Sequence, residues 1–195
     1  MKKLLPILAV LSLLALPALA DDVKTSSGTK NGKPYLQASQ KISGEATVLA
    51  VNKSTRELTL RSADGDTTKI KCGPDIKNFA QIAKGDGVKV VYTESLMITV
   101  EPPGTAGTST ETSTAAAKPG EHPHGSVTQK TTVKASIAAI DKAAGTATLQ
   151  MADGTQHVVT PRNPANLDKV KVGDMVVITY TEGLAASVEK PAAKK

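Results

Sequence analysis

Residues 46–65 read ATVLAVNKSTRELTLRSADG, and residues 135–154 read ASIAAIDKAAGTATLQMADG. The correspondence continues downstream, where GVKVVYTESLMITVEPP at 87–103 returns as MVVITYTEGLAASVEKP at 175–191. The matching positions are turn residues and alternating apolar residues, which is the pattern of a shared scaffold. Internal repetition at this spacing indicates two copies of one small unit instead of one large fold. We call residues 46–103 the first repeat and residues 135–191 the second repeat.

Each repeat has the pattern of five strands. Leu58 and Leu60 alternate with Thr59 and Arg61, as in a strand that buries one face. Asp64-Gly65 and its counterpart Asp153-Gly154 predict hairpins, because Gly adopts positive φ without strain. In the first repeat the expected strands are 46–51, 57–62, 67–72, 87–93 and 96–100.

A short helical turn is expected between the third and fourth strands. Asn78 is a candidate N-cap, and Phe79 and Ile82 share one face at i and i+3. The corresponding residues of the second repeat are Asn166, Leu167 and Val170. Three strands, a short helix and two strands is the order of a small OB-like barrel.

We therefore predict an all-β protein of two tandem five-stranded OB-like barrels, each with a short helical turn between strands 3 and 4. A unit of this size buries only a modest core, so marginal stability is expected. The predicted organisation is a signal peptide at 1–20, a flexible leader at 21–41, repeat domains at 42–101 and 132–189, a Thr/Ser/Ala/Pro-rich linker at 102–131 and a basic tail at 190–195.

The first twenty residues have the pattern of a secretory signal peptide. Lys2 and Lys3 precede an apolar stretch, and Ala18-Leu19-Ala20 is a small-x-small cleavage site. An uncleaved anchor is the alternative, but the apolar stretch is shorter than the roughly 20 residues of a spanning helix. Asp21 follows the site, so lipid attachment to a cysteine there is excluded. The sequence predicts a periplasmic protein that is neither inserted in the membrane after cleavage nor a lipoprotein.

Hairpin parity places one pair of possible metal ligands together. An odd-length loop around Asp64-Gly65 keeps Leu58, Leu60 and Ile70 on one face. The same register in the second repeat places Met151 and His157 on a common face. A thioether and an imidazole suit Cu(I) or Ag(I). The alternative is that Met151 fills the end of the barrel and His157 lies at its mouth.

Three other side chains are candidates for metal or thiol chemistry. His122 and His124, in the segment EHPHG, are a possible Cu(II) or Ni(II) pair, although a plain polar linker is the alternative. Cys72 is the only cysteine, so no internal disulfide forms. It is a reactive or metal-binding thiol, one half of an intermolecular disulfide, or a small buried hydrophobic residue.

Two functional classes lack support in the sequence. Nucleic-acid sites on OB folds stack bases on aromatic residues. This chain has no Trp, and Tyr92 and Tyr180 occupy equivalent scaffold positions. No nucleophile–base–orienter set recurs in both repeats, so we expect no enzymatic activity and no cofactor. The carboxylates that recur, expected at turns or strand bends, are Asp64/Asp153, Asp86/Asp174 and Glu94/Glu182. For Glu94/Glu182 the alternative is binding of a cation or ligand at the rim of the barrel.

Several motifs carry a resemblance to a known family. LTLR-x-ADG at 58–65, KNF-x-QI at 77–82, Gly85-Asp86 and YTESL at 92–96 resemble a family of small exported bacterial OB-like domains of unknown function. The corresponding segment of the second repeat reads PANLDKVKVGDMVVITYTEGL. The resemblance implies the fold and does not specify an activity.

The layout is also similar to the periplasmic copper-binding OB protein of copper/silver efflux systems. That family uses one His, two Met and a Trp on its second and third strands. Met151 and His157 fall in the comparable region, and this chain has no Trp.

We predict a non-enzymatic periplasmic binding or accessory module that interacts with an envelope protein. The alternative is a copper- or silver-binding protein using Met151 and His157. Without Lys2 and Lys3 of the predicted signal peptide, 22 basic and 18 acidic residues give a net charge of +4. This charge is a weak indication of an acidic partner and is also common in soluble proteins.

Overall fold

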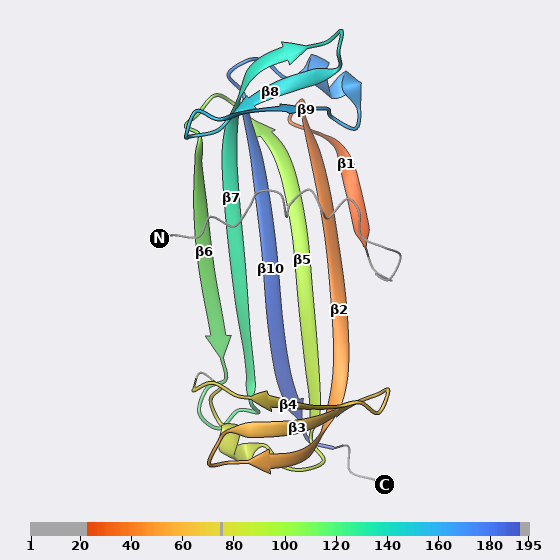
Figure 1. The fold of residues 1–195 in the computed structure, drawn as a ribbon, viewed down its shortest axis with the longest axis vertical. Helices are drawn as coiled ribbons and strands as arrows, with labels where there is room; N and C mark the ends of the chain where they lie inside the picture. Colours follow the sequence, from red (N-terminus) through yellow and green to blue (C-terminus); the bar gives the residue numbers. More distant parts are fainter. Residues whose placement is uncertain (1–22, 75, 192–195) are drawn as a thin grey trace. The chain divides into compact units, whose positions relative to one another are not determined.

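The computed structural model describes residues 23–74 and 76–191, so the predicted signal peptide lies outside the described residues. Within that range the predicted all-β class is confirmed (Figure 1). The elements in chain order are β1 (Lys24–Lys30), β2 (Lys33–Asn52), β3 (Glu57–Ser62), β4 (Thr67–Lys71), η2 (Phe79–Gln81), β5 (Gly87–Glu101), β6 (Gly107–Ala116), β7 (His124–Asp141), β8 (Thr146–Gln150), β9 (Gln156–Val159), η3 (Pro164–Lys169) and β10 (Met175–Glu189).

The strands form one ten-stranded sheet that is not closed. The order is β4-β3-β2-β5-β10-β7-β8-β9, with β1 paired to β2 and β6 paired to β7. The two closed five-stranded barrels expected from the repeat are therefore not confirmed. The separate strands expected at 87–93 and 96–100 are one continuous strand, β5, and β10 is continuous in the same way. Neither Gly nor Pro interrupts Tyr92–Leu96 of β5, and β10 remains extended although it has Gly183 in the equivalent stretch.

Two segments expected to be irregular contain strands. The predicted flexible leader at 21–41 includes β1 and the first part of β2. The predicted linker at 102–131 includes β6 and the start of β7. Every residue of β1 and nearly every residue of β6 is exposed. A strand that buries neither face shows no apolar alternation, which explains why composition alone indicated loops.

The predicted hairpin register is confirmed. Leu58 pairs with Ile70 and Leu60 with Thr68, and in the second repeat Leu149 pairs with His157. Burial differs from the expectation at one position, because Ile70 is 39% exposed. β4 is the terminal strand of the sheet order, so its side chains are covered from one side only.

The chain divides into two compact units that do not follow the predicted domain boundaries. Unit 1 contains the residues up to Gln40, together with 94–110 and 130–181. Unit 2 contains 41–93, 111–129 and the residues from Glu182 onward. Each unit therefore combines most of one repeat with the last part of the other repeat.

The core of unit 2 is built on β3, η2 and the nearby strands. Phe79 and Ile82 of the helical turn are 4% and 1% exposed, as the i, i+3 spacing predicted. The Arg56 guanidinium lies 4.5 Å from the centre of the Phe79 ring. The buried residues of this core are Val48, Leu58, Leu60, Cys72, Phe79, Ile82, Val88 and Val188.

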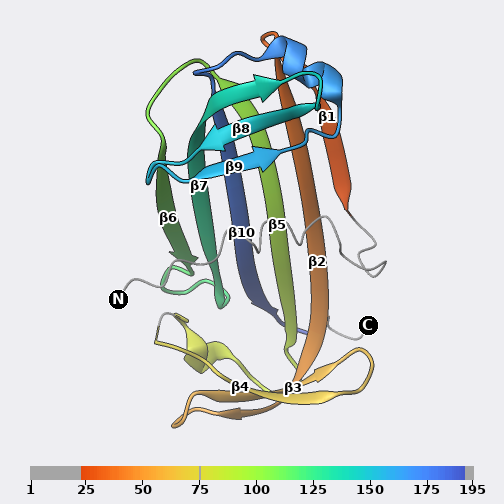
Figure 2. The ribbon, with the colours of Figure 1, turned by 45° about the horizontal axis from the view of Figure 1, so that its top comes forward.

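The core of unit 1 uses the equivalent positions of the second repeat. Ala135, Ile137, Leu149 and Val170 are buried together. In Figure 2, β8, β9 and η3 lie beside one another, and β8 contacts η3. Val100, Ile140, Met151 and Val176 pack against this core.

In both units, backbone hydrogen bonds join the turn at the Gly-Asp motif to a bulged strand. The N–H of Val48 donates to the Asp86 carbonyl at 2.9 Å, and the Gly85 N–H donates to the Val48 carbonyl at 2.8 Å. β2 has a bulge directly after Val48, between Val48 and Ala50. In unit 1 the same two bonds join Ile137 with Asp174 and Gly173.

One predicted cap differs from the structure. η3 begins after Asn163, whose side chain accepts a hydrogen bond from the Ala165 N–H at 3.1 Å, so Asn166 is not the N-cap. Asn78 does precede η2, but its side chain makes no capping bond. The Asn78 Nδ2 donates instead to the carbonyls of Lys118 and Glu121, at 2.7 and 3.1 Å.

Candidate functional site: the exposed edge of β9

β9 is an exposed terminal strand of the sheet. It follows β8 at one end of the strand order, and all four of its residues are exposed. Val158 is 70% exposed, and the neighbouring Val159 is 38% exposed. An exposed edge strand with apolar side chains is a template for pairing with another strand.

The backbone of β9 offers hydrogen-bonding groups at this edge. The Met151 N–H donates to the Thr155 carbonyl at 2.9 Å, so these two residues form a hydrogen-bonded pair. Hydrogen-bonded and non-hydrogen-bonded pairs alternate along an antiparallel ladder. The pairs of Gln156 and Val158 with β8 are therefore non-hydrogen-bonded. The N–H and C=O groups of these two residues point away from β8.

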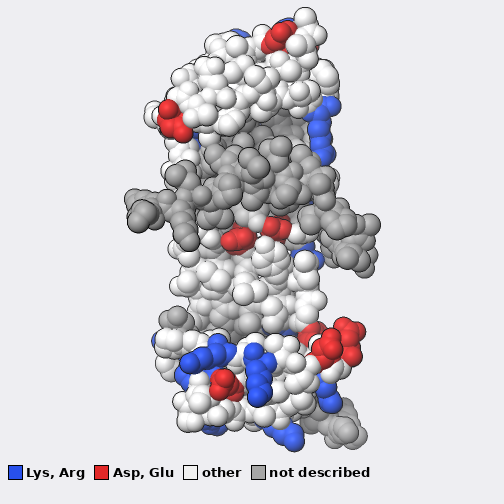
Figure 3. All heavy atoms as spheres, in the orientation of Figure 1, with Lys and Arg blue, Asp and Glu red and all other residues white. Residues whose placement is uncertain are grey.

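The equivalent edge in the first repeat is β4, and it carries charge. The Ser62 N–H donates to the Asp66 carbonyl at 2.9 Å, so the alternation directs the backbone groups of Lys69 outward. Lys69 occupies the position of Val158, and Lys71 occupies that of Thr160. Lysine on an edge strand opposes pairing with another chain. Figure 3 shows several Lys or Arg side chains over β3 and β4, whereas the surface over β8 and β9 is mainly uncharged.

The remaining edge strands lack an apolar anchor. β1 carries Lys24 and Lys30 at its ends and Ser, Thr and Gly between them. β6 carries Ser, Thr, Ala, Gly and one Glu. Both supply backbone groups, but neither presents a large apolar side chain. β9 combines outward backbone groups with the exposed Val158.

The predicted soft-metal pair lies next to this edge. His157 is exposed and pairs across the ladder with Leu149, while Met151 is half-buried against the core of unit 1. The two side chains share a face and are diagonal neighbours, as the parity predicted. The Thr155 N–H donates to the Asp153 carboxylate at 2.9 Å. This bond, with a smaller contribution from His157, lowers the pKa of Asp153.

The histidines of the EHPHG segment line a groove in unit 2. His122 and His124 are exposed, and the His122 carbonyl lies 3.0 Å from Nδ1 of His124. The groove has a volume of about 540 Å³, and Lys89 and Glu189 also line it. In the described part of the chain, no group of three or more His, Cys, Asp or Glu residues is placed to hold a metal ion.

The recurrent carboxylates have structural partners. Glu94, expected at a bend, lies inside β5 and accepts hydrogen bonds from the Tyr180 hydroxyl and the Gln40 amide. Asp86 and Asp174 are 2% and 4% exposed. Each accepts a backbone N–H three residues earlier, from Ala83 and Lys171 at 2.9 and 2.8 Å. These contacts support the predicted turn role of the Gly-Asp motif.

Comparisons with protein-family models, with curated proteins and with solved structures give no match for this chain. Among residues 23–74 and 76–191 there is no helix with the length and apolar character needed to cross a membrane.

Sequence reasoning did not identify Val158 as a site residue. The signal was present in the comparison of the two repeats, because Val158 stands where the first repeat has Lys69. A difference of this kind is informative only when both positions are known to lie on an exposed edge.

Proposed function

We propose that the protein is a non-enzymatic periplasmic binding module that pairs an extended segment of an envelope protein with β9. The observation that carries this proposal is the 70% exposure of Val158 on a terminal strand. In strand addition, main-chain hydrogen bonds supply affinity, and contacts with alternate side chains supply specificity. We expect the partner segment to place a β-branched or aromatic residue against Val158, because such cross-strand pairs stabilise sheets.

The difference between the two sheet termini supports this function. A protein that had to avoid all strand pairing would benefit from lysine on both terminal strands of the sheet, β4 and β9. The first repeat has Lys69 and Lys71 on β4, while the second repeat has Val158 and Thr160. The pattern fits a scaffold that blocks one edge and leaves the other available.

The OB-like assignment belongs to the same proposal. The short helical turn before the Gly-Asp motif and the bulged strand that receives it recur in both units. These features support descent of both repeats from one small OB-like barrel, related to the exported bacterial family that the motifs resemble.

A second candidate function is soft-metal binding by Met151 and His157. The register of β8 and β9 favours it, because both residues lie on one face of the hairpin. It requires further ligands from solvent or from a partner, since two ligands are too few for a tight site.

The strand-addition proposal is tested by selecting peptides from a random library on the full-length protein. Affinities of the selected peptides are then measured by fluorescence anisotropy for the wild type and for Val158→Lys. The proposal expects peptides rich in β-branched and aromatic residues, with at least tenfold weaker binding to the variant. Lys69→Val is the matched control and should leave this affinity unchanged. Selected peptides that bind Val158→Lys as well as the wild type would refute the proposal.

A further inference from the structure

The last part of each repeat packs in the unit that contains most of the other repeat. Val188 is 9% exposed in the core of unit 2, whose other buried members come from the first repeat. Val100 packs against the core of unit 1, among buried residues of the second repeat. These two valines are equivalent by sequence, so the exchange is reciprocal.

A second pair of contacts has the same reciprocity. Pro191 lies 3.9 Å from the position of a Cβ built on Gly85, and Pro103 lies 3.9 Å from the position of one built on Gly173. Pro103 and Pro191 are equivalent, as are Gly85 and Gly173. Residues 94–103, which we call segment A, and residues 182–191, segment B, therefore complete the two units in the same manner.

The same equivalence creates a competing fold. Segment A follows directly from the first repeat and carries the same Val and Pro as segment B. If each segment folded back on its own repeat, the result would be two closed units. The two segments differ at five equivalent positions, 95/183, 97/185, 98/186, 99/187 and 102/190, and the last of these follows the shared Val-Glu. Segment A reads Val-Glu-Pro at 100–102, whereas segment B reads Val-Glu-Lys at 188–190.

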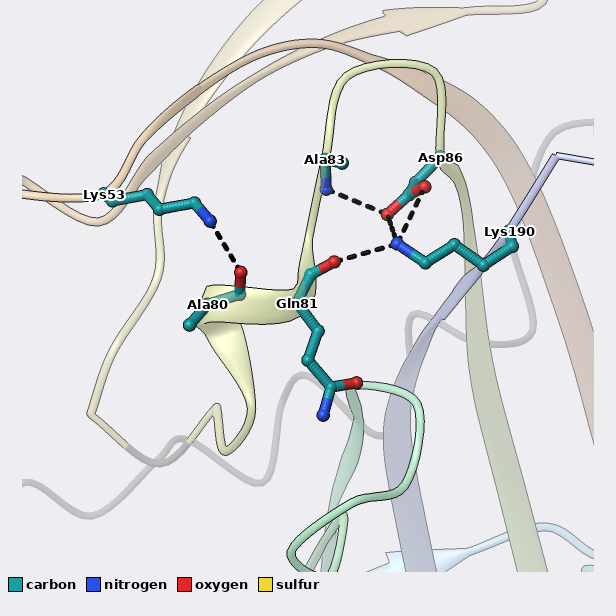
Figure 4. A network of polar contacts seen from close by, with 6 residues as sticks. All are labelled: Lys53, Ala80, Gln81, Ala83, Asp86 and Lys190. Atoms are coloured by element: carbon teal, nitrogen blue, oxygen red, sulfur yellow. Dashed lines mark hydrogen bonds and ion pairs between the residues drawn. The ribbon is translucent and has the colours of Figure 1, made fainter.

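Lys190 meets a buried carboxylate in unit 2. Its Nζ lies 2.9 and 3.2 Å from the two carboxylate oxygens of Asp86, and it also donates to the Gln81 carbonyl at 2.8 Å (Figure 4). Asp86 itself is 2% exposed. Segment A would bring Pro102 to this position and leave the buried carboxylate without its cation, which is unfavourable.

Unit 1 does not need a cation from the exchanged segment. Its buried carboxylate, Asp174, pairs with Lys33 of β2, which belongs to the same unit. Segment A, with Pro102, is therefore compatible with unit 1.

We propose that unit 2 is a strand-acceptor site that recognises segment B through Lys190, and that this recognition selects the exchanged fold over two closed units. The ligand of the site is an extended segment with a buried valine and a lysine two residues later. The proposal is independent of the binding function assigned to β9.

The test uses disulfide trapping in the full-length protein carrying Cys72→Val. A Cβ built on Gly87 lies 3.8 Å from the Glu189 carbonyl oxygen. Gly87→Cys with Glu189→Cys therefore reports the exchanged fold, and Gly87→Cys with Glu101→Cys reports the closed one. Oxidation followed by peptide mass spectrometry should recover the 87–189 disulfide and not the 87–101 disulfide. An 87–189 bond between two copies of the chain would also support recognition of segment B.

A residue swap tests the role of Lys190 itself. Lys190→Pro combined with Pro102→Lys should change the ratio of the 87–189 to the 87–101 disulfide at least tenfold, in favour of the latter. Lys190→Ala alone should lower the yield of the 87–189 bond. Lys53→Ala is the matched control, because Lys53 also contacts η2, through the Ala80 carbonyl at 2.7 Å, and should change nothing. An 87–101 disulfide in the parent, neither disulfide in folded protein, or no response to the swap would overturn the proposal.

Discussion

Lys190 donates a hydrogen bond of 2.9 Å to the Oδ2 of Asp86, although 104 residues separate them in the chain. Lys190 is half-exposed, while the Asp86 side chain is 3% exposed, so the carboxylate depends on this cation more than the lysine does. Asp86 also accepts the Ala83 N–H and so fixes the turn that leads into β5. The contact links the fold of the first repeat to a residue of the second.

Stability at low pH should depend on Asp174. Burial alone would raise the pKa of this carboxyl group, but the Lys33 hydrogen bond and the Lys171 N–H hold it below its usual range. The pKa of this carboxyl group is about 3.9 in the unfolded chain and lower in the folded protein, so the ionised group stabilises the folded state at pH values above about 3.9. This stabilisation is lost as the pH falls through the folded-state pKa. Urea unfolding between pH 3 and 7 should therefore show less loss of stability at low pH in Asp174→Asn than in the wild type. Identical pH profiles would contradict the assignment.

Replacing Gly183 by a larger residue should destabilise the protein, because one neighbouring side chain lies too close. A Cβ at this position would lie 2.8 Å from Oγ1 of Thr93, which must rotate away. Gly183→Ala should lower the free energy of unfolding by about 1 kcal/mol. Thr93→Ala should remove most of that cost in the double variant. Gly44→Ala, where no atom lies within 4 Å, is the control and should not be destabilising. Additive effects of the Gly183 and Thr93 changes would refute the steric explanation.

Cys72 should behave as a buried thiol and not as a reactive one. Burial raises its pKa, against a smaller opposing effect of the Arg56 guanidinium. Because the thiolate is the nucleophile, both burial and the raised pKa slow alkylation. Iodoacetamide labelling at pH 8, followed by mass spectrometry, should be at least tenfold slower in native than in urea-unfolded protein. Equal rates would restore the reactive-thiol interpretation.

The soft-metal candidate gives a distinct prediction. If Met151 and His157 bind Cu(I), titration against a competing chelator should show one equivalent per chain, with NMR shifts at both side chains. His157→Ala should abolish that binding, and the combined change His122→Ala with His124→Ala should leave it intact. Binding that persists in His157→Ala would exclude this pair as the site.

The local structure was predictable because local residues determine it. β3, β4, the hairpin register and the buried faces of Phe79 and Ile82 follow from alternation, turn residues and helical spacing. β1 and β6 could not be predicted in this way, because exposed Ser/Thr-rich strands have the composition of loops.

The long-range arrangement could not be predicted from the repeat. Val100 and Val188 have equivalent sequence contexts, so neither residue specifies which unit it joins. The distinguishing residues, Lys190 and Pro102, gain meaning only when the burial of Asp86 is known. The same holds for the candidate site, since Val158 is informative only as an outward-facing residue of an edge strand.

Amide hydrogen exchange of the full-length protein, measured by NMR with and without a library-selected peptide, tests the pairing of a partner segment with β9 most directly. Strand addition predicts that the peptide slows exchange at Gln156 and Val158, whose N–H groups point away from β8. Little change is expected at His157 and Val159, which already face β8. Protection at β4 or β6 instead, or no new protection along β9 at saturating peptide, would contradict the proposed function.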